Sequence, residues 1–117
     1  MKRDDDLIRK LLLECEASEE WLFPMPGLLI DSSKDEEIKR YHLLLLSDAG
    51  FLTKPASGTF RLTAQGHDFL DAIRSEDIWK KTKDGAAKIG GMTLDILKAV
   101  AIELFKQKVA EELGIPL

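Results

Sequence analysis

The amino-acid sequence predicts a mainly α-helical protein with a small β-hairpin, an α+β fold in one domain of 117 residues. Two observations lead to this fold class. Apolar residues recur every three or four positions in several segments, and most of these segments begin after Ser, Thr or Asp and end at glycine, as helices do. In addition, two short apolar stretches flank the turn sequence "PASG", as the strands of a hairpin do.

The first helix is expected in "DDDLIRKLLLECEA", where one of the three aspartates can cap it. The spacing of its apolar residues predicts a buried stripe of Ile8, Leu11, Leu12 and Cys15. The next stretch, "WLFPMPGLLIDSS", holds two prolines and a glycine, which exclude a helix. Its apolar residues 28–30 predict a brief strand at an irregular edge.

The second helix is expected to begin after Ser33 and to end before Gly50. At 100° per residue, its buried stripe is predicted to consist of Ile38, His42, Leu45 and Ala49. The four leucines 43–46 then spread round the helix, and we expect them to serve mainly for packing.

The hairpin is expected at residues 51–54 and 59–63, and three helices follow it. In its second strand, Phe60 and Leu62 alternate with polar residues, as in a half-buried strand. The expected caps of the three helices are Thr63, Ser75 and Thr93. The last helix is apolar over a wide arc, which predicts a homodimer through the C-terminal helix.

The order helix, strand, helix, hairpin is the layout of a winged helix, with the recognition helix at 35–49 and the wing tip at 55–58. We therefore expect a winged-helix-like domain over 1–117. Its winged-helix core is expected at 1–75, and a C-terminal helical extension at 76–117.

The segments "HLLLLSDAGFL" and "FRLTAQGHDFL" resemble the end of the recognition helix and the exit from the wing in PadR-like and arsenic-sensor-type winged-helix repressors. Across nearly the whole chain, "MKRDDDLIRKLLLE", "GHDFLDAIR" and the "WKKTK" segment resemble a small uncharacterised bacterial and prophage family, a domain of unknown function. Ala64 and Leu44 depart from that family's pattern, which often has tryptophan and a polar residue there. The resemblance implies a winged-helix-like fold and no established activity.

The leading expectation is a regulatory nucleic-acid-binding protein of phage or prophage type that contacts double-stranded DNA. The residues expected to bind it are Lys39, Arg40, Lys54, Arg61, Lys80, Lys81 and Lys83. Residues 51–63, the wing, hold two basic side chains and no acid. The lysines of "WKKTK" have an alternative reading, in which they only keep an amphipathic helix solvated.

Two features favour the alternative function, a protein–protein interaction module or adaptor that uses the same fold without binding DNA. The net charge is −4, and Asp35, Glu36 and Glu37 crowd the helical turn that a helix-turn-helix presents to bases. Moreover, prolines and an apolar triplet occupy the interval where a helper helix is expected, so that the motif is truncated.

The sequence predicts no enzyme, no metal site and no cofactor. The two histidines are His42 and His67, and the neighbours His67 and Asp68 point about 100° apart on a helix. No CxxC, HExxH or glycine-rich phosphate loop occurs. We expect His42 to be a core histidine that makes one backbone hydrogen bond. The tryptophans expected to anchor the core are Trp21 and Trp79.

The single cysteine, Cys15, cannot form an internal disulfide, and we expect its thiol to be buried and inert. No apolar run approaches the roughly 20 residues that span a bilayer. The N-terminus also lacks the apolar region of a signal peptide. These features predict a cytoplasmic protein without a membrane partner.

Overall fold

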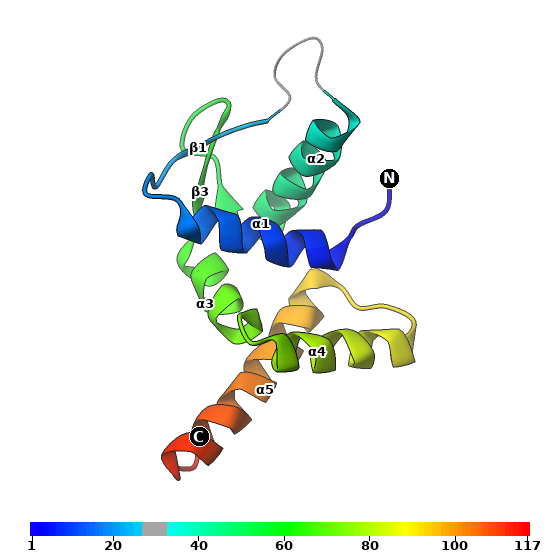
Figure 1. The fold of residues 1–117 in the computed structure, drawn as a ribbon, viewed down its shortest axis with the longest axis vertical. Coiled ribbons are helices and arrows are strands. Elements are labelled where there is room, and N and C mark those ends of the chain that lie inside the picture. The colour runs from blue at the N-terminus through cyan, green and yellow to red at the C-terminus, as the bar shows by residue number, and fades with distance from the viewer. Residues whose placement is uncertain (27–32) are drawn as a thin grey trace. The chain divides into compact units, whose positions relative to one another are not determined.

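In the computed structural model, residues 1–26 and 33–117 are described, and they form five helices and three strands (Figure 1). The elements are α1 Asp5–Ala17, β1 Phe23–Pro24, α2 Lys34–Asp48, β2 Leu52–Thr53, β3 Thr59–Leu62, α3 Ala64–Ile73, α4 Glu76–Ile89 and α5 Leu94–Leu113. They form two compact units, residues 1–67 and residues 68–117. The predicted class, mainly α with a small β-sheet, is confirmed.

α1 begins and packs as its sequence predicts. The carboxylate of Asp4 caps the helix by accepting a hydrogen bond from the backbone N–H of Leu7 at 3.1 Å. The buried residues are those of the predicted stripe, Ile8, Leu11, Leu12 and Cys15. An apolar stripe of this kind stabilises the unit by removing its side chains from water.

His42 ties α2 to the start of α1. Its Nε2 atom accepts a hydrogen bond from the backbone N–H of Asp4 at 2.8 Å, and its Nδ1 atom lies 2.8 Å from the carbonyl oxygen of Ile38. Because a backbone N–H can only donate, Nε2 carries no proton, and Nδ1 therefore donates to Ile38. The prediction of a core histidine is confirmed, with two backbone hydrogen bonds where one was expected.

β2 and β3 form the predicted hairpin. The two strands are antiparallel, and Leu52 pairs with Leu62. Phe60 and Leu62 are buried whereas Arg61 between them is exposed, as the alternation in the sequence predicts. The hairpin therefore covers the core of the first unit with one face and exposes its basic side chain on the other.

β1 adds a third strand, and the order in the sheet is β1-β3-β2. It pairs antiparallel with β3, with Phe23 opposite Phe60 and Pro24 opposite Thr59. The sequence does not predict this strand, because it is two residues long and contains a proline, which suits an edge position. The strand predicted at 28–30 lies outside the described residues.

α2 packs through a face other than the one predicted. The predicted cap is confirmed, since the hydroxyl of Ser33 accepts the backbone N–H three residues further on at 3.1 Å. The buried residues of the helix are His42, Leu43 and Leu46. Ile38, Leu45 and Ala49 are only partly buried, so the predicted stripe is wrong. A run of four leucines offers an apolar residue at many angles, and contacts with α1 decide which of them is buried.

Thr63 and Gly66 join the exit from the wing to the end of α2. The hydroxyl of Thr63 donates to the carbonyl of Gly50 at 2.6 Å and accepts from the N–H of Gly66 at 3.0 Å, which confirms the predicted cap. The N–H of Thr63 donates to the carbonyl of Phe51 at 3.0 Å. A Cβ on Gly66 would collide with that carbonyl oxygen and lie 2.8 Å from Cδ1 of Leu62. Position 66 therefore has room for glycine alone.

The second unit contains the rest of α3 together with α4 and α5, and α4 packs against α5. The predicted buried residues of α3 are confirmed; they are Phe69, Leu70 and Ile73. The hydroxyl of Ser75 accepts the N–H of Ile78 at 3.3 Å, and that of Thr93 accepts the N–H of Ile96 at 3.2 Å. Both predicted caps are therefore confirmed.

Candidate functional site

The side of α2 opposite its buried residues is acidic and apolar. Four residues at the i, i+4, i+7 and i+11 spacing of one helix face make up this outer face of α2: Glu37, Tyr41, Leu44 and Asp48. Glu37 and Asp48 are exposed, and the side chain of Tyr41 is 36% exposed. A helix that reads bases in the major groove normally presents basic and amide side chains on such a face.

Two of the residues predicted to bind nucleic acid, Lys39 and Arg40, lie on α2. The ammonium of Lys39 is 3.4 Å from the carboxylate of Glu14 on α1, so this side chain points to the packed side of the helix. Arg40 is partly buried and has interactions of its own. Neither Lys39 nor Arg40 belongs to the outer face of α2. Their contact with nucleic acid stays a prediction.

The wing presents the other two basic residues of the first unit that were predicted to bind nucleic acid. Lys54 follows β2 and Arg61 lies in β3, and both are exposed. Nη1 of Arg61 donates to the carbonyl of Leu62 at 3.2 Å. A hollow of about 550 Å³ at the wing tip is lined by Met25, Lys54, Ala56, Ser57 and Gly58. Because residues 51–63 hold no acid, the wing is locally basic.

The remaining predicted residues, Lys80, Lys81 and Lys83, lie on α4 in the second unit. Lys81 lies 3.3 Å from the carboxylate of Asp77, one turn earlier. The ammonium of Lys83 lies 5.7 Å from the centroid of the Trp79 ring. These contacts lie within α4, and they fit the reading in which the lysines solvate the exposed side of a helix.

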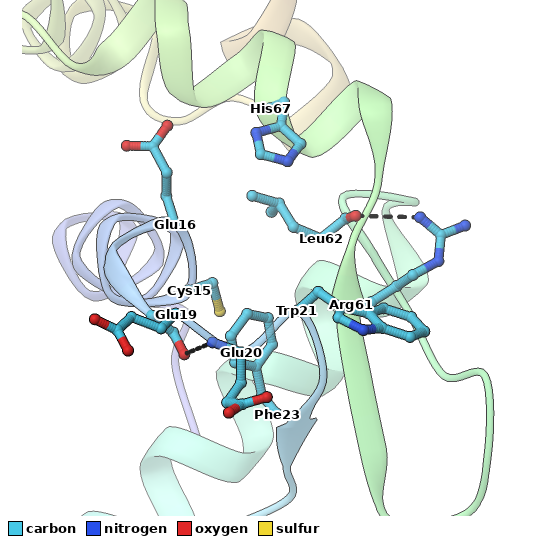
Figure 2. Close-up of a pocket in the computed structure, with 10 residues that line it drawn as sticks. Cys15, Glu16, Glu19, Glu20, Trp21, Phe23, Arg61, Leu62 and His67 are labelled. Atoms are coloured by element: carbon cyan, nitrogen blue, oxygen red, sulfur yellow. Dashed lines mark hydrogen bonds between the residues drawn. The ribbon is translucent and has the colours of Figure 1, made fainter.

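A cleft of about 300 Å³ lies at the end of α1, beside β3 (Figure 2). Three glutamates line it on the α1 side: Glu16, Glu19 and Glu20. Arg61 of β3, His67 of α3 and Trp21 also line it (Figure 2). An exposed indole beside carboxylates is suited to contact a basic or amphipathic side chain of another molecule.

Trp21, which lines the cleft, was predicted to be buried, and this prediction is wrong. Trp21 is 67% exposed rather than a core anchor, whereas Trp79 is 4% exposed, as predicted. Ser18 follows the last residue of α1, and its hydroxyl accepts the N–H of Glu20 at 3.1 Å; this turn leads the chain to the surface. The sequence signal that points to the cleft is a tryptophan directly after two glutamates at a helix end.

In residues 1–26 and 33–117, no group of three or more His, Cys, Asp and Glu side chains is placed to hold a metal ion. His42 is fully engaged with backbone atoms, and His67 is exposed. Across this part of the chain, no helix has both the length and the apolar character needed to cross a bilayer.

Cys15 is buried, as predicted. Burial raises the pKa of its thiol from 9.0 to about 11; Glu14 raises this pKa further and Lys39 lowers it. The folded state therefore favours the protonated thiol. Its contribution to stability is present below pH 9 and is lost as the pH rises from 9 towards 11.

We expect iodoacetamide to alkylate Cys15 slowly in the native protein at pH 9, and faster only as the pH approaches 11. The reason is that the thiolate is the reactive form and the folded protein holds little of it at pH 9. The measurement is the rate of alkylation by mass spectrometry, with protein unfolded in urea as the control. Equal rates in the two states at pH 9 would contradict the assignment.

Comparisons with known proteins identify the family of this chain. Residues 2–93 match the model of a family described as "Hypothetical protein (DUF2513)". The chain belongs to the DUF2513 family. A similar protein, an uncharacterized protein of Haemophilus influenzae (strain Rd), is 34% identical over 121 residues, covering 94% of this chain and 100% of the relative. No solved structure matches the chain significantly. The predicted membership of an uncharacterised family is confirmed, and the DUF2513 match ends directly before α5.

Proposed function

We propose that this chain is a protein-interaction module that presents the outer face of α2 to a partner protein. The observation that carries the proposal is the composition of that face, where two carboxylates flank a tyrosine and a leucine. In a winged helix, this is the helix expected to read DNA. Carboxylates repel phosphates, whereas aromatic side chains are enriched at protein interfaces.

The charge of the first unit supports a partner that carries basic residues. Residues 1–67 hold nine basic and twelve acidic side chains, a net charge of −3. Three of these twelve acids are the glutamates that line the cleft at Trp21. A cytoplasmic location, which suits the free thiol of Cys15, is part of the proposal.

Photocrosslinking in cells tests the proposal. With p-benzoylphenylalanine in place of Asp48, we expect the full chain to form a discrete adduct with another protein, because this position borders the contact. The same amino acid in place of Lys88, exposed on α4, is the matched control and should give no such adduct.

Adding Tyr41→Ala to the chain that carries the probe at position 48 should lower the adduct yield, since the tyrosine lies one turn away on the same face. Equal yields from the probes at positions 48 and 88, or a yield that does not respond to Tyr41→Ala, would count against a partner on this face. Circular dichroism of each variant checks that the helices are intact.

The wing supports a second candidate function, the binding of double-stranded DNA through phosphates. Its basis is that Lys54 and Arg61 are exposed on a hairpin free of acids. If both contact phosphates, affinity for a random duplex should fall about tenfold between about 50 and about 200 mM salt. The double variant Lys54→Ala and Arg61→Ala should abolish this salt dependence in a fluorescence anisotropy titration. A flat titration at low salt would speak against this second function.

A further inference from the structure

α5 carries apolar residues on all sides, yet few of them are fully buried. Of its 20 residues, Leu97 and Ala101 are the buried ones within the described part of the chain. Leu113, in its last turn, is 65% exposed. A helix that is apolar all round is normally covered on most sides, so the remaining sides of α5 are suited to a partner.

The side of α5 opposite its two buried residues forms a seam. Its apolar members are Ala99, Ile102, Val109 and Leu113, and Lys106 lies between the second and the third. These positions are separated alternately by three and four residues, which is the spacing of a coiled-coil seam. Within the second unit, Figure 1 shows the last turns of α5 (red) extending past α4.

We propose that this seam pairs with the same seam of a second copy of the chain, with the two α5 helices antiparallel. The charges beside the seam determine the direction. In an antiparallel pair centred between Leu104 and Phe105, Glu103 meets the partner's Lys106. Lys98 likewise comes near Glu112, towards the far end of the partner's helix. A parallel pair would place Lys106, which lies in the seam itself, opposite its own copy, and this contact is repulsive.

A second copy is the occupant because the seam complements itself. A two-fold axis makes every contact twice, so the pair of Glu103 with Lys106 forms on both sides of the axis. In this arrangement the small side chain of Ala99 lies level with the partner's Ala110, next to Val109, which lets the helices approach closely. α5 is about 30 Å long, and one helix pair of this length fits a reversible dimer rather than a permanent one.

Sedimentation equilibrium of the full chain over a range of concentrations tests the dimer. We expect a monomer–dimer equilibrium and at least a tenfold higher dimer Kd for Val109→Glu, which places two charges in the seam. Ile96→Glu is the matched control, because Ile96 is 50% exposed on another side of α5, and it should leave Kd within about twofold. Circular dichroism reports whether each variant keeps its helices.

A charge exchange between two chains tests the direction. Glu103→Lys and Lys106→Glu, as separate variants, should each weaken their own dimer, because like charges then meet across the axis. An equal mixture of the two variants should restore the dimer, since each chain then offers the other opposite charges. A restored mixture cannot come from contacts within one helix. A monomer at all concentrations overturns the proposal. So does a dimer whose Kd is unchanged by Val109→Glu and is not restored by mixing the two charge variants.

The dimer does not rest on the function proposed above. Its seam lies on α5, whereas the proposed protein contact uses the outer face of α2. Loss of the adduct from position 48 with an intact dimer would refute only the partner on α2. Loss of the dimer with an intact adduct would refute only the pairing of α5.

Discussion

Replacing Gly66 by alanine is expected to unfold the first unit. The added Cβ would collide with the carbonyl oxygen of Phe51 and lie 2.8 Å from Cδ1 of Leu62. That carbonyl also accepts the N–H of Thr63 at 3.0 Å, so it cannot retreat without breaking this hydrogen bond. We expect a loss of unfolding free energy of about 4 kcal/mol or more, much of the total stability of a typical domain.

Gly85→Ala is the matched control for this prediction. Gly85 also lies in a helix, but a Cβ there would meet only Cε of Met92, at the ordinary contact distance of 3.6 Å. Alanine should therefore raise the unfolding free energy by about 0.5–1 kcal/mol, because it restricts the unfolded chain and favours the helix. Urea unfolding followed by circular dichroism measures both variants. Similar midpoints for the two would contradict the close approach at Gly66.

His42→Leu is expected to have the second-largest effect. The substitution keeps most of the volume of the side chain but removes the acceptor for the N–H of Asp4 and the donor to the carbonyl of Ile38. Loss of these bonds should lower the unfolding free energy by about 1–3 kcal/mol. His67→Leu is the control, and it should change stability by no more than about 0.5 kcal/mol because His67 is exposed.

Nitrogen NMR of the native protein checks the reason for this effect. The ring of His42 should carry its proton on Nδ1 and none on Nε2, since Nε2 accepts the N–H of Asp4. The amide of Asp4 should also exchange faster with solvent in His42→Leu than in the parent protein. A proton on Nε2 at neutral pH would show that this contact between the two helices is misassigned.

Helix ends follow from the sequence because capping is local. Ser33, Thr63, Ser75 and Thr93 are all expected as caps, and each hydroxyl accepts a backbone N–H three residues further on. Such a bond depends on a few neighbouring residues and not on the rest of the fold. The alternation of Phe60 and Leu62 likewise follows from the period of a strand.

The rotation of α2 does not follow from the sequence, because contacts between distant residues decide it. His42 and Asp4 are 38 positions apart, and Lys39 reaches Glu14 on another helix. With leucines at four consecutive positions, the apolar pattern alone leaves several rotations open. With this rotation, α2 presents an acidic and apolar outer face. Such a face favours a protein partner over DNA.

The candidate site is less predictable than the fold. Tryptophan is a large apolar residue and is largely buried in most proteins, so Trp21 was expected in the core. A short turn after α1 instead places Trp21 at the surface. The basic residues of the wing are placed as expected, since a hairpin exposes every second side chain. The lysines of α4 lie in the second unit, residues 68–117, which contains the whole extension expected at 76–117.

The contacts of Thr63 and Gly66 also limit what sequence similarity to other proteins can reveal about the function of this chain. A hydroxyl and a missing side chain, three positions apart, are needed wherever a chain turns from a hairpin into a helix in this manner. We therefore expect selection for that turn to retain the two residues whatever ligand a protein binds. Shared "LTxxG" letters therefore report common geometry, and biochemical roles diverge at positions that folding leaves unconstrained, such as Tyr41.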